Sequence, residues 1–519
     1  MPDGGTPAAP ASAGAILRKT ANGAGWVVGW RMARRLLGFA STIVLARLLV
    51  PSDFGLVALA TSIAGALEAV SSLGVEDAIV RARDPSRELF DTGFTINLLR
   101  GIGTAIAVAI AAWPTARFFG DLRLWPVMLA LAAASLVGSL TNIGTVDFRR
   151  TISFDKEFVL LIVPRVIGAI ATMTVALLTR SYWALVIGIV TSRVVGVMAS
   201  YWMHPYRPRL GVSCWRELAG FSFWVWVIGL VQMIRDRLDQ LMIGKLLGDR
   251  AVGFLSVSWE IAHLPTTELV GPLGRASFAG FSAAQYSGVD VGKMYMRVMG
   301  AVCLVALPTG IGVSAVAAPL VRLLLGTKWS AVAPVVALAA VVSVSAGLGL
   351  ITTNVLTAFG KMKAQFQITC LFTVVRVLLL LFFIPRYGLL GAITAAGIGM
   401  ALEFGTYIAL AARQFGLAAT TFLGAIWRPV VGVSAMAAML TYTHLGWLPV
   451  GGSIGGAVVS VALASAAGAG VYCASVGLLW VVSGKPEPSA ESDLTELMSV
   501  AGRRLFWRAA TLARSKRAG

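Results

Sequence analysis

The sequence predicts an all-α polytopic membrane protein with about 14 transmembrane helices. Three observations support this fold class: an apolar composition, apolar runs of membrane-spanning length, and a hairpin motif that occurs twice. Hydrophobic residues make up 57% of the 519 residues and charged residues only 13%, and the mean hydropathy is +0.81. A soluble domain carries about 25% charged residues, so we expect this chain to have lipid as its solvent.

Each predicted helix is an apolar run that can cross a bilayer, which takes about 20 residues for about 30 Å of hydrocarbon. The runs are expected near residues 24–50, 54–80, 94–113, 124–143, 158–178, 183–203, 219–247, 251–273, 296–325, 331–357, 364–384, 388–412, 425–447 and 453–482. No long polar insertion separates them. We therefore expect no soluble domain and no large external catalytic loop.

The basic residues predict the orientation of the helices, because cytoplasmic loops of membrane proteins carry an excess of Lys and Arg. The net charge is +19, and it lies mostly between the apolar runs, which favours a membrane protein over a nucleic-acid partner. The connections that are poor in basic residues hold Arg47, Arg117, Arg123, Arg180, Arg250, Lys328 and Arg386. The alternate, richer set is expected to be cytoplasmic, together with both termini, which fits an even number of helices.

The two ends of the chain differ in composition. Residues 1–23 are rich in Ala, Gly and Pro and are expected to be disordered and cytoplasmic, without the features of a cleaved signal peptide. In the tail, 485–519, apolar residues recur at helical spacing among arginines and lysines. This pattern predicts a basic amphipathic helix on anionic lipid headgroups, with a partner-protein contact as the alternative.

The four cysteines, Cys214, Cys303, Cys370 and Cys473, stand far apart, without a CxxC motif or a neighbouring pair of histidines. A metal site or a disulfide framework is therefore not expected. The chain also has no G-x-x-x-x-G-K-[ST] motif for nucleotide hydrolysis. The sequence thus predicts a protein that needs no cofactor.

A hairpin motif occurs twice in the chain. LARLLVPSDFGLVALA at 45–60 aligns with IGKLLGDRAVGFLSVS at 243–258, which places Gly55 on Gly253. Because six predicted helices separate the copies, both enter the membrane from the same side. The sequence therefore predicts two parallel six-helix lobes, followed by two extra helices; such repeats are used by transporters that rock about a shared midplane site. The lobes are expected at 24–212 and 213–414, and the extra helices at 415–484.

Several motifs resemble the Wzx-type polysaccharide flippases, which belong to the multidrug/oligosaccharidyl-lipid/polysaccharide exporter superfamily. The motifs are LARLLVPSDFGLVALA, LGVEDAIV, DTGFTINLLRG, ARFFGD, WALV, PYRPRL and LDQLMIGKLLGDRAVGF. The resemblance implies a V-shaped, alternating-access flippase for polyprenyl-diphosphate-linked glycans in the bacterial inner membrane, with glycan polymerase and glycosyltransferases as possible partners. One departure is Glu260, because related proteins often carry a basic residue in this stretch.

Three arginines in the first helix predict an anion site. Leu36 to Val50 would span only about 22 Å, which is too short for a bilayer, so the helix must also include Arg31, Arg34 and Arg35. Their spacing puts them on one face, and Arg forks match the geometry of phosphate. We expect them to line a cavity and hold a diphosphate; the alternative is that they reach lipid headgroups.

Other ionisable residues fall inside predicted helices, where they cost several kcal/mol unless they face a cavity or a partner. Arg235 and Arg237 in the seventh helix are expected to join the binding site. The alternative is that Arg235 pairs with Asp239, four residues further, while Asp236 and Arg237 point elsewhere. Arg165 is a further candidate for the lining. Arg193 and Arg376 are secondary candidates of the same kind.

A secondary transporter couples to an ion gradient, and a carboxylate in a helix can carry the coupling proton or ion. The candidates are Glu68, Asp236, Asp239, Glu260, Glu268 and Glu403. His263 lies three residues after Glu260, a spacing that suggests a proton pair. A hydrogen-bonded histidine without such a role is the alternative.

The sequence therefore predicts a transporter without covalent catalysis, with polyprenyl-diphosphate-linked glycan as its cargo. One alternative is a drug or metabolite antiporter of the same superfamily, which the arginine face and the number of helices oppose. Another is a membrane glycan polymerase or ligase, which the short connections oppose. A polymerase mutant accumulates single repeat units outside the cell, whereas a flippase mutant retains them on the cytoplasmic leaflet.

Overall fold

The computed structural model describes residues 13–70, 75–81, 85–151, 153–215, 237–284, 288, 290–447, 454–486 and 489–492. These residues form helices and connecting loops without a β-strand, which confirms the all-α prediction. The chain divides into two compact units, Met1–Gly253 and Phe254–Gly519.

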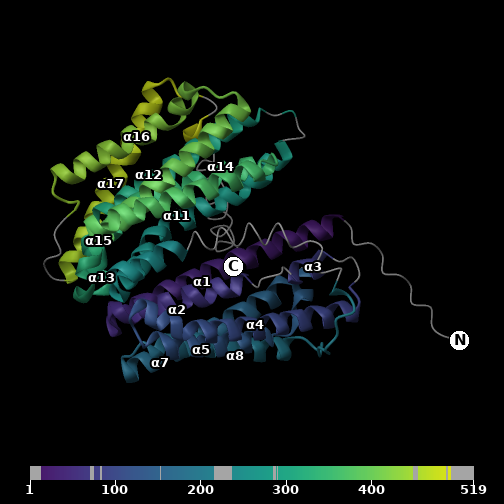
Figure 1. The fold of residues 1–519 in the computed structure, drawn as a ribbon. Helices are drawn as coiled ribbons and strands as arrows, with labels where there is room; N and C mark the ends of the chain where they lie inside the picture. The colour runs from purple at the N-terminus through teal and green to yellow at the C-terminus, as the bar shows by residue number, and fades with distance from the viewer. Residues whose placement is uncertain are drawn as a thin grey trace, which may run out of the picture. The chain divides into compact units, whose positions relative to one another are not determined.

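Unit 1 is a bundle of long helices with three short helical segments (Figure 1). Its helices are α1 (Ala13–Leu48), α2 (Pro51–Val70), α3 (Val75–Arg81), α4 (Arg87–Phe119), α5 (Leu124–Ser139), η1 (Ile143–Val146), α6 (Asp147–Arg150), α7 (Phe154–Thr179) and α8 (Trp183–Met203). Residues 237–247 are also helical. Helix α7 packs against α1 and α8, and α5 packs against α2, α4 and α8.

The ends of α4 show how the sequence sets the length of a helix. Ser86 precedes the first turn, and its Oγ accepts a hydrogen bond from the backbone N–H of Leu89 at 3.3 Å, which satisfies one of the free donors at a helix start. Gly120 ends the helix with a φ of 74°, a left-handed conformation that glycine adopts without strain. The next turn, 120–123, leads directly into α5.

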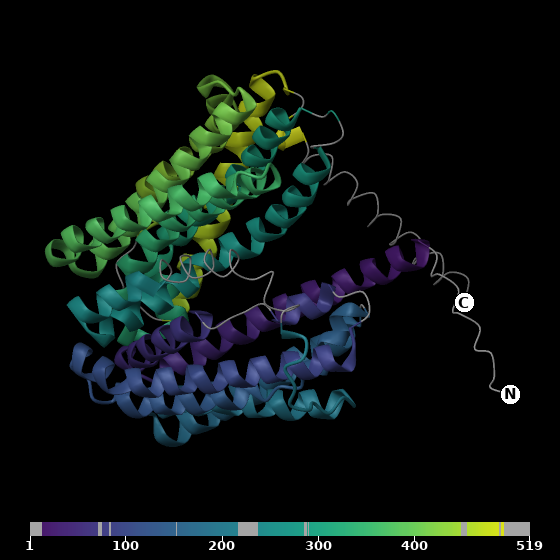
Figure 2. The ribbon, with the colours of Figure 1, turned by 45° about the vertical axis from the view of Figure 1, so that its right-hand side comes forward.

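Unit 2 consists of a second set of long helices, which Figures 1 and 2 show in teal to yellow. They are α11 (Asp249–Ala284), which begins at the end of unit 1, α12 (Val291–Ala315), α13 (Ala317–Leu325), η2 (Thr327–Val332), α14 (Ala333–Ala358), α15 (Met362–Phe415), α16 (Ala419–Tyr442) and α17 (Ile454–Val482). Helix α14 packs against α12 and α15, and α16 packs against α12 and α17.

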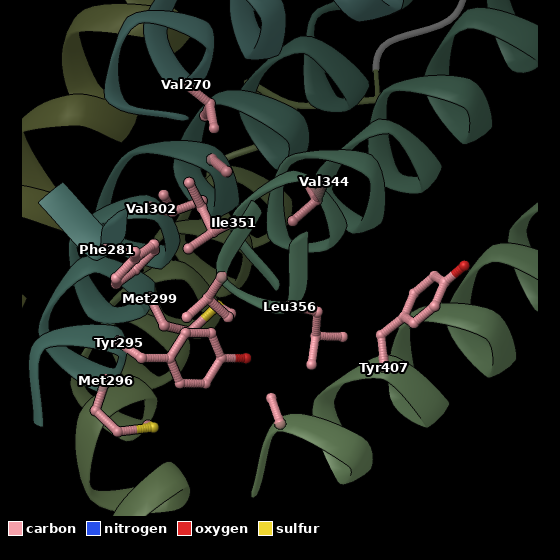
Figure 3. Close-up of a cluster of buried hydrophobic side chains, with 13 residues drawn as sticks. Val270, Phe281, Tyr295, Met296, Met299, Val302, Val344, Ile351, Leu356 and Tyr407 are labelled. Atoms are coloured by element: carbon pink, nitrogen blue, oxygen red, sulfur yellow. The ribbon is translucent and has the colours of Figure 1, made fainter. Parts of the chain in front are cut away.

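The core of unit 2 is a cluster of interlocked large side chains from α11, α12, α14 and α15 (Figure 3). Phe281, Met299 and Ile351 are fully buried there, and Tyr295 donates or accepts a 3.0 Å hydrogen bond with Thr352. In lipid, the hydrophobic effect does not drive helices together, so close packing and interhelical hydrogen bonds stabilise such an assembly.

Nine helices in the described part of the chain are long and apolar enough to cross a membrane, or ten if the bent pair Leu124–Ser139 and Ile143–Arg150 is one span. The chain is thus a polytopic membrane protein. Helix α15 counts once, although it covers two predicted spans. Gly388 (φ 56°, ψ −135°) interrupts its helical conformation and divides it into two halves. The predicted spans 24–50 and 251–273 correspond to α1 and α11, which are not among these nine helices.

Several predicted boundaries differ from the structure. Helix α1 begins at Ala13, within the segment 1–23 that was expected to be disordered; Ala, Leu, Arg and Lys in 13–19 are good helix formers. The predicted span 54–80 ends at Val70, and α3 is separate. The predicted span 296–325 consists of α12 and α13, because the backbone turns at Val316 (φ −100°, ψ 10°).

Two predictions fall mainly outside the described residues: most of the span 219–247, and the amphipathic tail helix beyond residue 492. The division into lobes at 212/213 stays a prediction, as does the total of about 14 spans.

Candidate functional site

Three arginines from three helices of unit 1 form the strongest candidate site. Arg34 lies on α1, Arg165 on α7 and Arg193 on α8, and the charges of Arg34 and Arg193 both act on Arg165. We call these three residues the arginine cluster. Helix α7, which carries Arg165, packs against both α1 and α8, and this packing brings the three residues within range of one another's charge. The sequence predicted Arg34 and Arg165, while Arg193 was only a secondary candidate.

The surroundings of Arg193 explain its position. An added Cβ on Gly138 of α5 would lie 3.1 Å from Nη1 of Arg193 and 3.3 Å from its Cδ. The arginine stem therefore lies across a helix position that has no side chain. On the next turn of α8, Gly196 faces Pro164, which directly precedes Arg165. Small residues thus let the helices that carry the cluster approach each other.

Glu68 of α2 joins the arginine cluster. Its two carboxylate oxygens each accept a hydrogen bond from Nη2 of Arg193 at 3.3 Å. The side chains are 37% and 45% exposed, respectively. An exposed ion pair contributes only about 0–1 kcal/mol, so Arg193 can exchange Glu68 for another anion at little cost. The site therefore combines fixed positive charge with a replaceable internal carboxylate.

Arg237 approaches the same helix, α2, at a different point. Its Nη1 donates to Ser62 Oγ at 3.4 Å, and an added Cβ on Gly65 would lie 3.6 Å from its Nη2. The structure therefore places Arg237 against α2, the helix that also carries Glu68. Asp239, two residues further, is buried.

The remaining predicted residues of unit 1 are only partly described. Arg35 is half-buried on α1, next to Arg34 in the sequence. The Arg31 side chain lies outside the described part of the structure, as do Arg235 and Asp236. The predicted three-arginine face of the first helix is thus represented by Arg34 and Arg35.

Unit 2 holds a second polar group of residues, which differs from the arginine cluster in its burial. Glu403 is only 4% exposed, and its Oε1 accepts hydrogen bonds from Thr369 Oγ1 and Tyr407 OH, each at 3.4 Å. The two hydroxyls are 2.7 Å apart. Buried Arg376 packs its stem on Gly399, one turn before Glu403. We call Thr369, Arg376, Glu403 and Tyr407 the Glu403 cluster.

Sequence reasoning found Glu403 and Arg376 but missed Thr369 and Tyr407. Tyr407 follows Glu403 by four residues, which puts both on one helix face. Thr369 lies in the other half of α15, so only the interruption at Gly388 brings it near. A four-residue spacing was a usable signal for Tyr407, but no local pattern indicated Thr369.

The other predicted residues of unit 2 lie on α11. Glu260 is half-buried. His263 stacks on Trp259, one turn earlier, with ring centroids 4.6 Å apart and an interplanar angle of 18°. The pairing of His263 with Glu260 stays a prediction, and the Glu268 side chain lies outside the described part of the structure.

The PYRPRL motif has a structural position in unit 1. Asp91 of α4 accepts a hydrogen bond from the backbone N–H of Arg209 at 2.8 Å and another from the Tyr206 hydroxyl. Burial, together with the hydrogen bond and charge of Asp91, raises the pKa of Tyr206. Asn142 Nδ2 donates to the Tyr206 carbonyl at 2.7 Å. The motif thus fastens the loop after α8 to α4 and η1, outside the arginine cluster.

Neighbouring His204 is held in the same loop. Burial lowers its pKa, which the charge of Asp147 only partly offsets. Among the described residues, no three His, Cys, Asp or Glu side chains converge on a possible metal position. The arginine cluster is the strongest candidate site, and guanidinium groups from three helices offer the donors that an anion site needs.

Comparison with known proteins places the chain among polysaccharide biosynthesis proteins. The model of the family described as "Polysaccharide biosynthesis protein" matches residues 44–334, more than half of the chain. "Lipopolysaccharide biosynthesis protein WzxC" of Escherichia coli (strain K12) is 24% identical over 86% of this chain and 88% of that protein. "Succinoglycan biosynthesis transport protein ExoT" of Rhizobium meliloti (strain 1021) is 25% identical over 60% of this chain and 65% of that protein.

Two solved structures share the fold. "Lipid II flippase MurJ, inward closed conformation" has a TM-score of 0.71 at 12% identity and covers 87% of this chain and 99% of its own. An inward-facing multidrug resistance MATE family transporter has a TM-score of 0.59 at 16% identity, over 74% of this chain and 94% of its own. These similar proteins are transporters or flippases rather than enzymes. The chain therefore belongs to the polysaccharide biosynthesis protein family, which confirms the resemblance of its motifs to the Wzx-type flippases.

Proposed function

We propose that this protein is a flippase that moves a polyprenyl-diphosphate-linked oligosaccharide across the bacterial inner membrane. The observation that carries the proposal is the arginine cluster, in which Arg34, Arg165 and Arg193 come from three different helices of one unit. Guanidinium groups bind phosphate oxygens in a bidentate geometry. The names of two similar proteins, a lipopolysaccharide biosynthesis protein and a lipid II flippase, support the same class of cargo.

In this proposal the diphosphate of the cargo binds the arginine cluster and displaces Glu68 from Arg193. The exchange is favourable because a diphosphate offers more charge and more acceptor oxygens than one carboxylate. The sugars would cross beside the bound diphosphate, while the polyprenyl chain stays in lipid. Alternating access by the two predicted lobes, 24–212 and 213–414, is part of the proposal, as are a cytoplasmic location of both termini and cooperation with glycan polymerase and glycosyltransferases.

Among the predicted coupling residues, Glu68 is the best placed. It already bonds to Arg193, so a proton on Glu68 would release that arginine for the cargo, and loss of the proton would return it. Glu403 is the second choice, because its acceptor oxygen is held by two hydroxyls in unit 2. Asp239 and Glu260 follow, and Asp236 completes the set.

The arginine cluster also separates this proposal from an antiporter for organic cations. A site with three arginines and one glutamate repels a cationic drug and attracts a phosphate. The fold alone does not separate them, since the MATE transporter shares it. The choice between a cationic and a phosphate-containing cargo therefore rests on the charge of the site.

The test replaces each arginine of the cluster by glutamine in a strain whose own gene is deleted. Arg34→Gln, Arg165→Gln and Arg193→Gln should each lower surface glycan at least tenfold and trap the lipid-linked repeat unit on the cytoplasmic leaflet. Arg117→Gln is the matched control, because it removes an arginine of the same unit that is not part of the arginine cluster. Arg117 lies near the C-terminal end of α4, where its guanidinium lies over Trp113. Normal export by all three cluster variants, at wild-type protein levels, would contradict the proposal.

A further inference from the structure

A buried ion pair fastens the start of the C-terminal tail to unit 2. Arg428 of α16 donates from Nε and Nη2 to the two carboxylate oxygens of Glu491, at 2.8 and 3.0 Å, and the side chains are 8% and 7% exposed. A bidentate pair fixes orientation as well as distance. Because the loss of either partner would leave a buried charge behind, the pair holds Glu491 firmly on α16. We call this ion pair the tail clasp.

The residues around Glu491 form the beginning of a helix. Residues 490–492 are helical. Ser489 Oγ accepts a hydrogen bond from the backbone N–H of Ser492 at 3.2 Å, and Ser492 Oγ accepts one from the backbone N–H of Ser489 at 3.1 Å. This reciprocal arrangement is a capping box, which marks the first turn of a helix. The tail clasp therefore holds a capped helix start, in which Glu491 is the second helical residue.

Small residues of unit 2 receive this first turn. An added Cβ on Gly300 of α12 would lie 3.4 Å from the carbonyl oxygen of Ala425 and 3.5 Å from Cβ of Ala490. Ala490 thus lies against α12 where that helix has no side chain. Because α12 also packs against α16, the first turn of the tail contacts two helices of unit 2. Packing and the ion pair together set its position.

Aromatic residues place this anchor at the membrane surface. Trp427 directly precedes Arg428 and is 38% exposed. Helix α17 ends at Val482, and Lys485 Nζ, just beyond it, lies 6.0 Å from the centroid of the Trp480 ring. Tryptophan is enriched where transmembrane helices meet the headgroups, and a lysine at a helix end extends toward them. The charge pattern assigns these two helix ends to the cytoplasmic face, so the tail starts at the level of the cytoplasmic headgroups.

The sequence beyond residue 492, which lies outside the described residues, has the charge pattern of a surface helix. Its two acidic residues, Asp493 and Glu496, come next to the capped start, where the helix dipole favours negative charge. Apolar residues recur at helical spacing, and the basic residues all follow later: Leu494, Leu497, Ala501, Leu505 and Leu512, then Arg503, Arg504, Arg508, Arg514, Lys516 and Arg517. An apolar stripe with basic flanks is typical of a helix that lies on anionic lipid.

We propose that the tail clasp positions residues 493–519 as a binding surface for anionic phospholipid headgroups on the cytoplasmic leaflet. Arg428 and Glu491 are positioning residues, and the basic residues beyond them bind the lipid phosphates. A helix that is held at its first turn, at headgroup level, loses less freedom when its arginines bind lipid. A protein partner, the competing occupant, would not require the anchor to lie at that level. The inference does not depend on the identity of the cargo.

The first experiment measures the dependence on lipid. The full-length chain, with its four natural cysteines replaced by serine, carries a fluorophore on Ala501→Cys, in nanodiscs of phosphatidylcholine with or without phosphatidylglycerol. Acrylamide quenching should fall about threefold or more in the anionic discs, because the apolar stripe enters the membrane surface. Ala510→Cys is the matched control: it lies about two and a half helical turns further, on the opposite face, and should be quenched alike in both discs. Equal quenching at 501 in the two discs, or protection that needs added cytosolic protein instead of anionic lipid, would overturn the inference.

The second experiment separates the clasp from the charges of the tail. Arg503→Gln, Arg504→Gln and Arg508→Gln together should abolish the difference between the two kinds of disc. Glu491→Gln keeps these charges, yet it should restore about half or more of the quenching at 501 in anionic discs, because the helix start is no longer held. The exchanged pair, Arg428→Glu with Glu491→Arg, should protect the label again. If Glu491→Gln lowers thermal stability but leaves the label protected, the clasp is only structural and its positioning role is wrong.

Discussion

The arginine cluster of unit 1 and the Glu403 cluster of unit 2 contain the same kinds of charge in opposite environments. Glu68 and Arg193 are 37% and 45% exposed, and their contacts are 3.3 Å long. Glu403 and Arg376 are 4% and 9% exposed, and two hydroxyls hold the glutamate. An exposed ion pair can exchange partners, whereas a buried group loses its hydrogen bonds if a partner leaves. We therefore propose that cargo binds in unit 1 and that the buried groups of unit 2 mainly maintain its packing.

The largest effect is expected for a second sealed interaction of unit 2. Arg428 of α16 donates from Nε and Nη2 to the two oxygens of Glu491, at 2.8 and 3.0 Å, and both side chains are below 10% exposed. Arg428→Leu would leave Glu491 buried without this partner, which costs about 3–5 kcal/mol. Thermal unfolding in detergent should show the loss. Arg117→Leu, at an exposed position, is the control and should change stability far less.

Glu403→Leu should destabilise unit 2 by about 1–3 kcal/mol, because it removes an acceptor that two buried hydroxyls share, although Tyr407 keeps the Gln365 carbonyl at 3.2 Å. Glu403→Gln keeps an acceptor oxygen in place, and we expect it to cost less than about 1 kcal/mol. The same unfolding assay ranks the two variants. Equal losses would mean that the charge of Glu403, rather than its hydrogen bonds, maintains this region, and the comparison between the units would fail.

The pH dependence of stability should also distinguish buried ion pairs from exposed ones. Burial raises the pKa of Glu491, but the hydrogen bonds and charge of Arg428, together with hydrogen bonds from its own backbone and from Ser489, outweigh burial and lower the pKa below the ordinary value of 4.5. A carboxyl whose folded pKa is lowered stabilises the protein above its unfolded pKa, and this contribution is lost as pH falls through the folded value. Wild type should therefore exceed Glu491→Gln in stability at pH 7. The difference should shrink below about pH 4.5; a constant difference would contradict this assignment.

The smallest change in stability is expected for Glu68→Gln, below about 1 kcal/mol, because its ion pair is exposed. Its effect on function should be larger. Without the internal carboxylate, Arg193 stays available to phosphate, so purified protein should bind inorganic pyrophosphate severalfold more tightly at neutral pH. Export should fall at the same time, because release of the cargo slows. Weaker pyrophosphate binding by Glu68→Gln than by wild type would contradict the proposed exchange between Glu68 and the cargo.

The sequence predicted the class of the site better than its members. Arg34 and Arg165 were identified because charged residues inside apolar runs need a cavity or a partner. Arg193, which shares the cluster, looked no more central than Arg376, which is sealed in unit 2. The two arginines have the same local pattern, an apolar helix with one charge. Their difference depends on neighbouring helices, which local sequence does not contain.

The repeated hairpin motif also shows what local sequence cannot predict. An alignment of two short motifs put Gly55 on Gly253 and predicted parallel copies, but it gave no reason for the glycines. The reason is that the backbone of Asp249 leaves no room for a Cβ on Gly55, and the backbone of Pro51 leaves none for a Cβ on Gly253. Each of these neighbours lies some two hundred positions away in the chain. Similarly, the position of Thr369 beside Glu403 follows from the interruption of α15 at Gly388.

By itself, the sequence determined that the chain is a helical membrane protein with positive charge inside its apolar segments. These properties follow from composition and helical periodicity, which act within about 20 residues of one another. The tertiary structure decided which charges are exposed and which are sealed, and which glycines mark a contact rather than a flexible turn. Burial and close approach are set by helices distant in sequence, so they exist only once the chain has packed.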